Sequence, residues 1–498
     1  MASRPGWRSE AVRVLVTGAT GYVGGRLVPR LLDAGHRVRC LARTPEKLRD
    51  HPWRDRVEVV KGDVSDGSGL DEALTGMDVA YYLVHAMAGG SGFAAQDAEG
   101  ARTFARAAER AGTGRIVYLG GLAPPGEALS AHMASRTEVG DIFLASPVPA
   151  AVLRAAVIIG SGSASFEMLR HLTERLPAMT TPRWVRSRVQ PIAVRDVLRL
   201  LVEAADLPPD TDRTFDVGGP EVLTYAEMIQ RFAAVAGISR RLIIPVPVLS
   251  PGLSSLWVGL ITPVPPSIAR PLVESLRHDS VMREDDLSDL LGDHERLRFD
   301  EAVKLALRRV NESNVDTRWS SAAWPTAPSD PLPTDPDWAG GSLYTDECTR
   351  TVDAPPERLW SVIEGIGGER GWYSWPLAWA ARGWIDIAVG GVGLRRGRRD
   401  PARLRVGDSL DFWRVEEIEP GRLLRLRAEM RLPGLAWLEM SVEREDGRTV
   451  YRQRALFRPR GLAGHLYWKA VTLFHGLVFG DMARNIAARA SREAPPTA

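Results

Sequence analysis

The sequence predicts a doubly wound parallel α/β domain followed by a smaller α+β domain, and three observations support this. Apolar strands alternate with helices from residue 12 to about residue 160, a pattern typical of a parallel sheet covered on both faces. A glycine-rich turn directly follows the first strand. Beyond residue 318 lie eleven of the 15 tryptophans, and from residue 344 a helix, several alternating strands and a long closing helix indicate a second domain.

Composition limits the class of protein. A chain of 498 residues is too long for one ordinary domain, and 44% hydrophobic with 25% charged residues is typical of a soluble globular protein. The net charge of +2 argues against a nucleic-acid partner. With only Cys40 and Cys348 no disulfide framework is implied, and the first ten residues lack the apolar core of a signal peptide, so we expect a cytoplasmic location. Nothing in the sequence indicates an oligomeric state.

The first domain is expected to cover residues 1–313. Its strands are predicted at 12–16, 37–43, 56–64, 78–87, 115–121 and 151–160, and its helices at 26–36, 69–74, 94–112 and 131–144, with a more irregular region up to about residue 310. Residues 314–343 contain five prolines and no apolar periodicity, which is typical of a linker. The second domain is expected to cover residues 344–498.

The turn "TGATGYVG" has the spacing of a phosphate-binding loop. Gly18 permits the tight turn, Gly21 lets the backbone approach a pyrophosphate, and Gly24 lets the following helix pack on the sheet. The motif follows a strand and opens a helix, which is the context that a dinucleotide-binding Rossmann domain requires. We therefore assign this turn to a cofactor site, with Gly18, Thr20, Gly21, Tyr22, Val23 and Gly24 as its residues.

The residues after the second and third strands bear on the choice of cofactor. Where an acidic residue usually holds the ribose 2′-hydroxyl of NAD, this chain has Arg43. A guanidinium suits a 2′-phosphate, so Arg43 favours NADP over NAD; a merely solvated arginine is the alternative. Asp63 and Val64 follow the third strand, where side chains can meet the adenine.

Residues 12–310 resemble an atypical, extended short-chain dehydrogenase/reductase, similar to NmrA-like and complex I 39-kDa-subunit-like proteins. The motifs that carry the resemblance are "TGATGYVGGRL", "GDV" at 62–64, "LRAAVIIGSG" at 153–162, "PIAVRDV" at 191–197 and "FDVGGPEVLTYAEM" at 215–228. Reductases of this family use a serine after the fifth strand and a tyrosine with a lysine four residues later. The resemblance therefore implies an NADP-dependent oxidoreductase whose proton donor must be located.

The expected catalytic residues are missing from the places where the family has them. Gly120 and Gly121 stand at the serine position, and "HMASR" places His132 and Arg136 where tyrosine and lysine are expected. No tyrosine occurs between residues 118 and 225, and no lysine between residues 61 and 304. His132 is a candidate proton donor or acceptor, since a histidine titrates closer to neutral pH than a phenol, and Arg136 a candidate cofactor contact. His85, at the end of the fourth strand, is a second catalytic candidate or a lining residue of the cofactor pocket.

Residues 344–498 resemble the helix-grip domains of the START and polyketide-cyclase (SRPBCC) type, and an uncharacterised domain that is often fused to such reductases. The resemblance lies in "APPERLWSVIEGIGGERGWY", "GDSLDFWRVEEIEPGRLLRL" and "FRPRGLAGHLYWKAVTLFHGLVF". It implies an apolar cavity between sheet and helix, and candidate lining residues are Trp372, Trp375, Trp379, Trp413 and Trp437; packing in the core is the alternative for each. The basic run Arg395–Asp400 is either a solvated turn or an anion contact.

Two functions remain open at this point. One is an NADP-dependent oxidoreductase acting on a small hydrophobic molecule, and the other is an NADP(H)-binding regulator or scaffold without turnover. A membrane-surface contact is a weaker alternative, because residues 242–269 carry no charge but contain six prolines that a spanning helix would not tolerate easily. We see no spacing of metal ligands and no nucleophile elbow in the sequence.

Overall fold

The computed structural model describes residues 11–85, 92–124, 129–181, 183–245, 261–292, 294–313, 332–336, 342–367, 371–373 and 403–492. The chain divides into two compact units, Met1–Gly341 and Ser342–Ala498, and each is described by itself.

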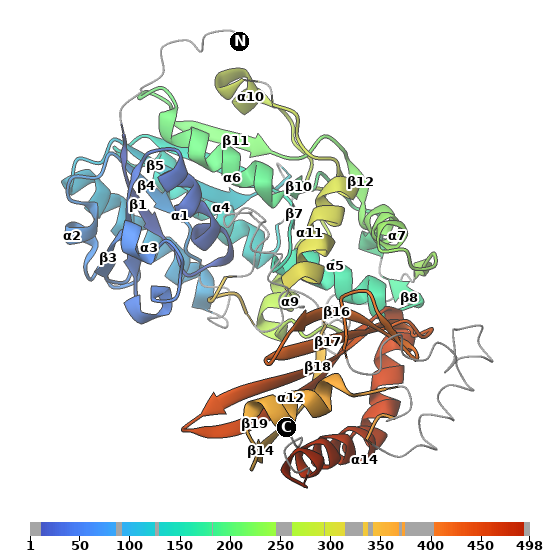
Figure 1. Ribbon diagram of the computed structural model, residues 1–498. Helices are drawn as coiled ribbons and strands as arrows, with labels where there is room; N and C mark the ends of the chain where they lie inside the picture. The colour runs from blue at the N-terminus through green and yellow to red at the C-terminus, as the bar shows by residue number, and fades with distance from the viewer. Residues whose placement is uncertain are drawn as a thin grey trace. The chain divides into compact units, whose positions relative to one another are not determined.

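A seven-stranded sheet forms the centre of the first unit (Figure 1). Its order is β11-β6-β5-β4-β1-β2-β3, and all neighbouring strands are parallel. The strands are β1 (Arg13–Thr17), β2 (Arg37–Ala42), β3 (Glu58–Lys61), β4 (Val79–Tyr82), β5 (Arg115–Gly121), β6 (Ala150–Ala155) and β11 (Arg213–Val217). The chain reverses its direction of travel across the sheet between β1 and β4, which is where ligands bind in such folds. The predicted α/β Rossmann class is confirmed.

Helices cover both faces of this sheet. They are α1 (Tyr22–Asp33), α2 (Leu70–Leu74), α3 (Phe93–Arg110), α4 (Ala131–Leu144) and α6 (Val194–Glu203). Alternate residues of β1 point to opposite faces, so Val14 and Val16 share a core with α1 and α6, whereas Leu15 shares a core with α2, α3 and α4. This two-sided burial explains why the strands are apolar almost throughout.

Several predicted elements differ from the observed ones, and the third strand, predicted at 56–64, covers only Glu58–Lys61. The strand predicted at 151–160 is divided: β6 ends at Ala155, and β7 (Ile158–Ile159) pairs instead with β10 (Ile192–Ala193) in a separate small sheet. The strand predicted at 78–87 ends at Tyr82, because Leu83 to His85 turn over the carboxyl edge of the sheet. The first helix begins at Tyr22, four residues before its predicted start. Apolar runs continue past the sheet edge in each strand, so composition alone does not mark where pairing stops.

Apart from α6 and β11, which belong to the seven-stranded sheet and its covering helices, residues 156–313 build a smaller lobe next to the carboxyl edge. Its further elements are α5 (Ala164–Arg175), β8 (Ala178–Thr181), β9 (Arg188–Val189), β12 (Leu223–Thr224), α7 (Tyr225–Val235), β13 (Leu242–Pro245), α9 (Pro266–Ser275), α10 (Asp286–Leu291) and α11 (Phe299–Ser313). Short strand pairs β10-β7, β12-β9 and β13-β8 connect them.

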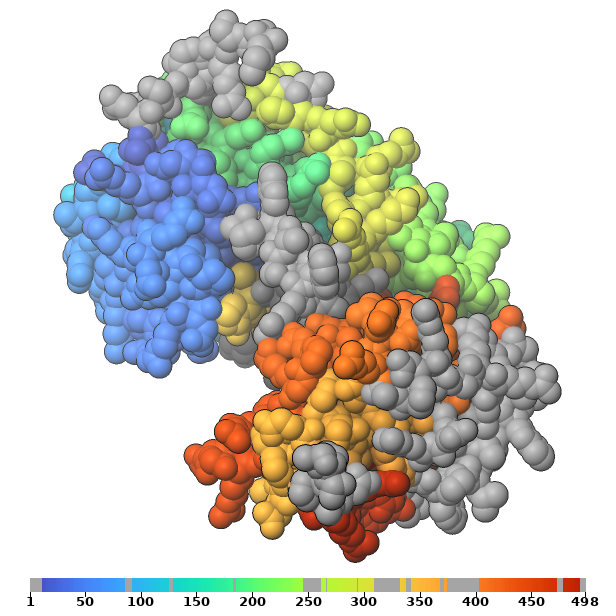
Figure 2. All heavy atoms as spheres, in the orientation of Figure 1, coloured from blue at the N-terminus to red at the C-terminus, as the bar shows by residue number. Residues whose placement is uncertain are grey.

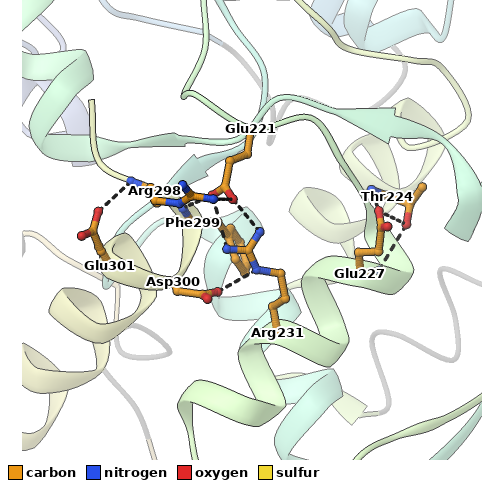
Figure 3. A network of polar contacts seen from close by, with 8 residues as sticks. All are labelled: Glu221, Thr224, Glu227, Arg231, Arg298, Phe299, Asp300 and Glu301. Atoms are coloured by element: carbon orange, nitrogen blue, oxygen red, sulfur yellow. Dashed lines mark hydrogen bonds and ion pairs between the residues drawn. The ribbon is translucent and has the colours of Figure 1, made fainter. Parts of the chain in front are cut away.

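A polar network fixes α7 and α11 of this lobe (Figure 3). The Glu221 carboxylate accepts hydrogen bonds from Arg231 at 2.9 and 3.3 Å, from Arg298 at 2.9 Å and from the Phe299 backbone at 2.9 Å. Arg231 also donates to Asp300 at 2.8 Å. One partly buried carboxylate, whose side chain is 15% exposed, thereby joins helix α7 to the start of helix α11.

The second unit contains a six-stranded antiparallel sheet and a long terminal helix (Figure 1). The strand order is β14-β19-β18-β17-β16-β15. The elements are β14 (Tyr344–Val352), α12 (Pro356–Glu364), β15 (Ser409–Leu410), β16 (Trp413–Glu419), β17 (Leu423–Ala428), β18 (Gly434–Glu445), β19 (Arg448–Pro459) and α14 (Gly461–Arg492). The predicted α+β class is confirmed, and helix α14 packs on β14, β19 and α12 as a helix-grip arrangement requires.

Three of the tryptophans predicted to line a cavity in the second unit belong to its interior. Trp372, Trp413 and Trp437 are all buried, and Trp372 stacks on Phe412 while its indole N–H donates to Asp411 at 2.7 Å. Trp375, Trp379 and the basic run Arg395–Asp400 lie outside the described residues. A ligand cavity in this unit stays a prediction.

Two sequence segments are only partly described. Of the predicted linker, residues 332–336 and 342–343 are described, and residues 332–336 belong to the first compact unit. Of the uncharged segment 242–269, residues 246–260 lie outside the described part. Within the described ranges, no helix is both long and apolar enough to cross a membrane.

The Glu221 network generates a stability prediction. Glu221→Gln should lower the free energy of unfolding of the first unit by about 1–3 kcal/mol, because cationic donors would lose their anionic acceptor. Burial alone would raise the pKa of Glu221, but the hydrogen bonds from Arg231 and the Phe299 backbone outweigh it and lower the pKa. The stabilisation is therefore present above the unfolded-state pKa and lost as the pH falls through the folded-state pKa.

Urea unfolding of both proteins at neutral pH and in acid would measure this. The difference between wild type and Glu221→Gln should shrink in acid. Glu58→Gln is the matched control, since Glu58 also pairs with an arginine but its side chain is 71% exposed, and it should change stability by less than about 1 kcal/mol. Equal effects of the two substitutions would contradict the assignment.

Candidate functional site

The turn between β1 and α1 is shaped by its glycines. Gly18 has a positive φ of 74°, and a Cβ atom there would lie 2.6 Å from the Leu83 carbonyl oxygen. A Cβ atom at Gly24 would lie 2.2 Å from the Gly18 carbonyl oxygen. Both approaches exclude any side chain, so the turn can lie close to the end of β4 and the N-terminus of α1 faces the carboxyl edge of the sheet. This is the cradle that a pyrophosphate needs.

A cavity of about 630 Å³ opens over this turn. It collects residues from the ends of β1 to β5 and from the lobe, and it lies at the point where the strand order reverses. Every site residue predicted from the sequence lines it: Gly18, Thr20, Gly21, Tyr22, Val23, Gly24, Arg43, Asp63, Val64, His85, His132 and Arg136. The structure thus brings all twelve together, while the role of each stays a prediction.

One end of the cavity carries an accessible positive charge. The Arg43 side chain is 79% exposed, and its Nη1 lies 4.0 Å from the Asp63 carboxylate, which is a long ion pair. Asp63 itself is held in place because its carboxylate accepts the Ser65 backbone N–H at 2.9 Å. A weakly engaged guanidinium after β2 can turn to a 2′-phosphate at little cost.

The other end holds two histidines and a partly buried arginine, Arg136. The rings of His85 and His132 lie 6.0 Å apart. The Arg136 guanidinium lies 5.2 Å from the centre of the Tyr118 ring and donates to the Leu119 carbonyl. His85 Nδ1 is buried and has no hydrogen-bond partner among the described residues. A buried polar atom of this kind is costly unless a ligand pairs with it.

These surroundings correct the expectation that a histidine here titrates near neutral pH. Burial, followed by the charge of Arg136, lowers the pKa of His132 to about 4. Burial, Arg136 and then His132 lower the pKa of His85 well below its ordinary value. Both imidazoles are therefore neutral at pH 7, and each has one N–H to donate and one nitrogen to accept.

The tyrosines of the cavity do not replace the missing catalytic phenol. Tyr22 and Tyr82 both line it, but burial raises the pKa of each hydroxyl. The Tyr22 hydroxyl lies against Gly160, where a Cβ atom would be only 2.4 Å away. The Tyr118 hydroxyl donates to the Arg136 carbonyl at 3.2 Å and is also buried. None of these three phenols is poised to act as a base near neutral pH.

Several lining residues were missed by the sequence reasoning. They are Gln96 and Asp97 of α3, Gly162 to Ser165 around the start of α5, Ile268 and Leu272 of α9, and Thr334 and Pro336 of the predicted linker. The start of α5 carried a signal, since "GSGSAS" before a helix is typical of an anion-facing N-terminus. The other missed residues are distant in sequence from the recognised motifs, and no sequence pattern marked them as part of the site.

Helix α9 forms an apolar wall of the cavity. Ile268 and Leu272 lie four residues apart, so they share one face of the helix. Helix α9 packs against α4, and the Ser130 hydroxyl at the start of α4 lies 3.1 Å from the Ser275 hydroxyl at the end of α9. Because α4 carries both His132 and Arg136, the polar and apolar parts of the cavity are held on packed helices.

Comparison with known proteins identifies both parts of the chain. A family model described as NAD(P)H-binding matches residues 18–155, and one described as a protein of unknown function (DUF2867) matches residues 338–482. The second match names neither a fold nor a ligand, so the resemblance to START-like domains stays a prediction.

Among curated proteins, the chain is similar to ceramide reductase of Caulobacter vibrioides, with 33% identity over 256 residues that cover 50% of this chain and 78% of that protein. It is 29% identical to the (4-alkanoyl-5-oxo-2,5-dihydrofuran-3-yl)methyl phosphate reductase of Streptomyces griseus, over 53% of this chain and 85% of the relative. A 3-beta-hydroxysteroid dehydrogenase of Mycolicibacterium neoaurum is 34% identical over 125 residues, 23% of this chain and 33% of its own length.

Among solved structures, the triphenylmethane reductase of Citrobacter sp. complexed with NADP(H) has a TM-score of 0.48 and 21% identity, over 59% of this chain and 99% of the other. The identity and coverage of ceramide reductase, together with the NAD(P)H-binding match, confirm the predicted dinucleotide cofactor at the level of NAD(P). Through its first unit, the chain belongs to the NAD(P)-binding, short-chain dehydrogenase/reductase-type family of oxidoreductases that includes ceramide reductase.

Proposed function

We propose that the first unit is an NADP-dependent reductase that acts on a carbonyl group of a small hydrophobic molecule. The observation that carries the proposal is one cavity that combines an exposed arginine after β2, two neutral histidines and an apolar wall. In this proposal the arginine binds the 2′-phosphate of the cofactor, and the histidines donate hydrogen bonds to the carbonyl oxygen as it gains negative charge. The apolar wall contacts the hydrophobic part of the substrate.

The adenosine end supports NADP rather than NAD. Arg43 stands where a carboxylate would hold a free ribose 2′-hydroxyl, and its accessible guanidinium offers two parallel N–H donors to a phosphate. Asp63 and Val64 line the same end and suit the adenine. The glycine turn, which no side chain can fill, suits the pyrophosphate.

The histidine end supports reduction without a tyrosine. NADPH, when bound, supplies a hydride to an electrophilic carbon. A neutral imidazole of His132 or His85 can donate an N–H hydrogen bond to the carbonyl oxygen, and this hydrogen bond strengthens as negative charge develops there. The imidazole keeps its proton, so the alkoxide that forms takes its proton from solvent water. A histidine whose pKa is lowered acts in this way, as a neutral electrophile, in other enzymes. Arg136 adds positive charge behind both rings.

The apolar wall supports a hydrophobic substrate. Ile268 and Leu272 face the cavity from α9, and no charged residue accompanies them on that helix's side of the lining. The relatives named ceramide reductase and 3-beta-hydroxysteroid dehydrogenase support this substrate class, whereas the name of the third relative is that of a methyl phosphate compound. We further propose that the second unit binds or presents the same class of molecule.

A non-catalytic regulator is the second candidate. It is favoured by one specific observation, the absence of any titratable phenol or lysine among the described lining residues that could transfer a proton near neutral pH. Such a protein would bind NADP(H) and turn nothing over. The experiments below separate the two functions.

The first experiment concerns the cofactor. Arg43→Asp should weaken NADPH binding by about 1.5–3 kcal/mol and leave NADH binding equal or tighter, because it replaces a phosphate partner by a hydroxyl partner. Isothermal calorimetry with both nucleotides measures this. Arg37→Asp is the control, since Arg37 is also exposed but begins β2 at the opposite edge of the sheet. Equal affinities of the native protein for NADPH and NADH would contradict the NADP assignment.

The second experiment concerns turnover. With hydrophobic carbonyl compounds, His132→Phe should lower kcat by about 10²–10³-fold and leave the NADPH dissociation constant nearly unchanged, because the lost hydrogen bond is made to the reacting oxygen. His85→Phe should weaken binding instead if His85 only lines the cavity. Turnover that survives both substitutions would exclude histidine catalysis. Tight NADPH binding without turnover on any carbonyl compound would establish the regulator.

The third experiment measures the histidine protonation states directly. In an NMR titration of the free protein, His132 should lose its proton near pH 4, so no inflection of its ring signals is expected between pH 6 and 8. Arg136→Gln should raise the pKa of both histidines, because a neighbouring positive charge disfavours the protonated ring. A midpoint of His132 near pH 6.5 in the native protein would refute the neutral-donor mechanism.

A further inference from the structure

The described part of the predicted linker forms a small turn on the first unit. The Asp335 backbone N–H donates to the Leu332 carbonyl at 2.9 Å, and the Asp335 carboxylate accepts the Leu332 N–H at 2.9 Å. Figure 2 shows the segment 332–336, in golden yellow, against the blue atoms of the N-terminal elements. We call this segment the strap.

A buried ion pair attaches the strap to helix α1. The Asp335 carboxylate accepts hydrogen bonds from both terminal nitrogens of Arg26, at 2.9 and 2.6 Å. The two side chains are only 2% and 11% exposed. Breaking such a pair leaves a desolvated guanidinium, which makes the attachment far stronger than a surface ion pair.

Two further contacts seat the strap beside the phosphate-binding turn. The Leu332 side chain packs on Gly25, where a Cβ atom would come within 2.7 Å of its Cδ1. The Thr334 hydroxyl lies 3.3 Å from His51 Nε2. Thr334 and Pro336 then line the same cavity as the glycine turn.

Arg26 connects the ion pair to the turn itself. It lies one helical turn after Tyr22, donates to the Tyr22 carbonyl at 3.1 Å, and its guanidinium lies 4.2 Å from the centre of the Tyr22 ring. Tyr22 is the first residue of α1 and lines the cavity. Asp335 therefore holds the arginine that packs on a wall of the dinucleotide site.

We propose that the strap is a functional part of the dinucleotide site: Thr334 and Pro336 complete its wall, and Asp335 is a positioning residue that acts through Arg26 on Tyr22. The proposal rests on cofactor binding in the cavity, as assigned above. It extends the site from residues 12–310 to a segment that the sequence marks only as a linker.

A thermodynamic consequence follows from this coupling. If the attached strap strengthens NADPH binding by a given factor, bound NADPH must stabilise the attached strap by the same factor. The native protein can therefore be tested without any substitution.

Calorimetry of NADPH binding tests the strap through Asp335→Asn. We expect a loss of affinity of about fivefold or more. The control is Asp33→Asn at the opposite end of α1, because Asp33 also faces an arginine, Arg56, but at 3.7 Å and with both side chains about half exposed. Thermal unfolding of the cofactor-free variants would show whether lost stability alone explains the change. Equal or tighter NADPH binding by Asp335→Asn overturns the proposal.

Hydrogen exchange of the native protein is the second measurement. The strap has three backbone amides, at Leu332, Thr334 and Asp335, since its other two residues are prolines. Saturating NADPH should slow exchange in a peptide that covers them by about the factor found by calorimetry. If the native protein binds NADPH but hydrogen exchange in the strap is unchanged, the strap proposal is overturned. If the native protein binds neither NADPH nor NADH, the proposed function is overturned instead.

Discussion

The site depends on a close approach between the first turn and the fourth strand. Gly18 lies so near the Leu83 carbonyl that a side chain cannot fit between them. The Thr17 hydroxyl reinforces this contact, because it donates to the Tyr81 carbonyl at 3.0 Å and accepts the Leu83 N–H at 3.2 Å. The end of β1 is thereby joined to the end of β4 at the point where the strand order reverses. The glycine turn and His85, which come from these two strand ends, share one cavity for this reason.

Charge is distributed unevenly along that cavity. Arg43 is exposed and only weakly paired, so it is available to a ligand phosphate. Arg136 is engaged by the Leu119 carbonyl and the Tyr118 ring, so it acts on its surroundings as a fixed charge. That charge adds to burial in keeping both histidines neutral. The two arginines thus differ in their surroundings, because Arg43 is exposed whereas Arg136 is partly buried and already engaged.

Sequence reasoning predicted the parts of the molecule whose signals are local. The helix at 131–144 has the predicted bounds, and the glycine spacing led to all six turn residues that line the cavity. Burial is a property of the folded chain, so the pKa of His132 was expected near its ordinary value. Contacts such as Arg26 with Asp335, separated by 309 residues, leave no pattern in either segment. The end of β6 was missed because the apolar run continues into β7, which pairs with another strand.

In the function that we propose, another packed arrangement stands where the family has its serine, tyrosine and lysine. A Cβ atom at Gly120 would lie 3.1 Å from the Tyr118 ring, so a serine there would require that ring to shift by a few tenths of an ångström. The guanidinium of Arg136 lies over the Tyr118 ring, and the backbone carbonyl of Arg136 accepts a hydrogen bond from the Tyr118 hydroxyl. The ring also packs against the aromatic rings of Phe143 and Tyr82. Glycine, Tyr118 and Arg136 are therefore mutually dependent, and Arg136 in turn lowers the pKa of both histidines. Random loss of catalytic residues would not be expected to produce a packed arrangement in which the buried Nδ1 of His85 has no hydrogen-bond partner within the described part of the chain. These mutual contacts favour the proposed reductase, in which neutral histidines interact with the substrate, over a non-catalytic protein that only binds the cofactor.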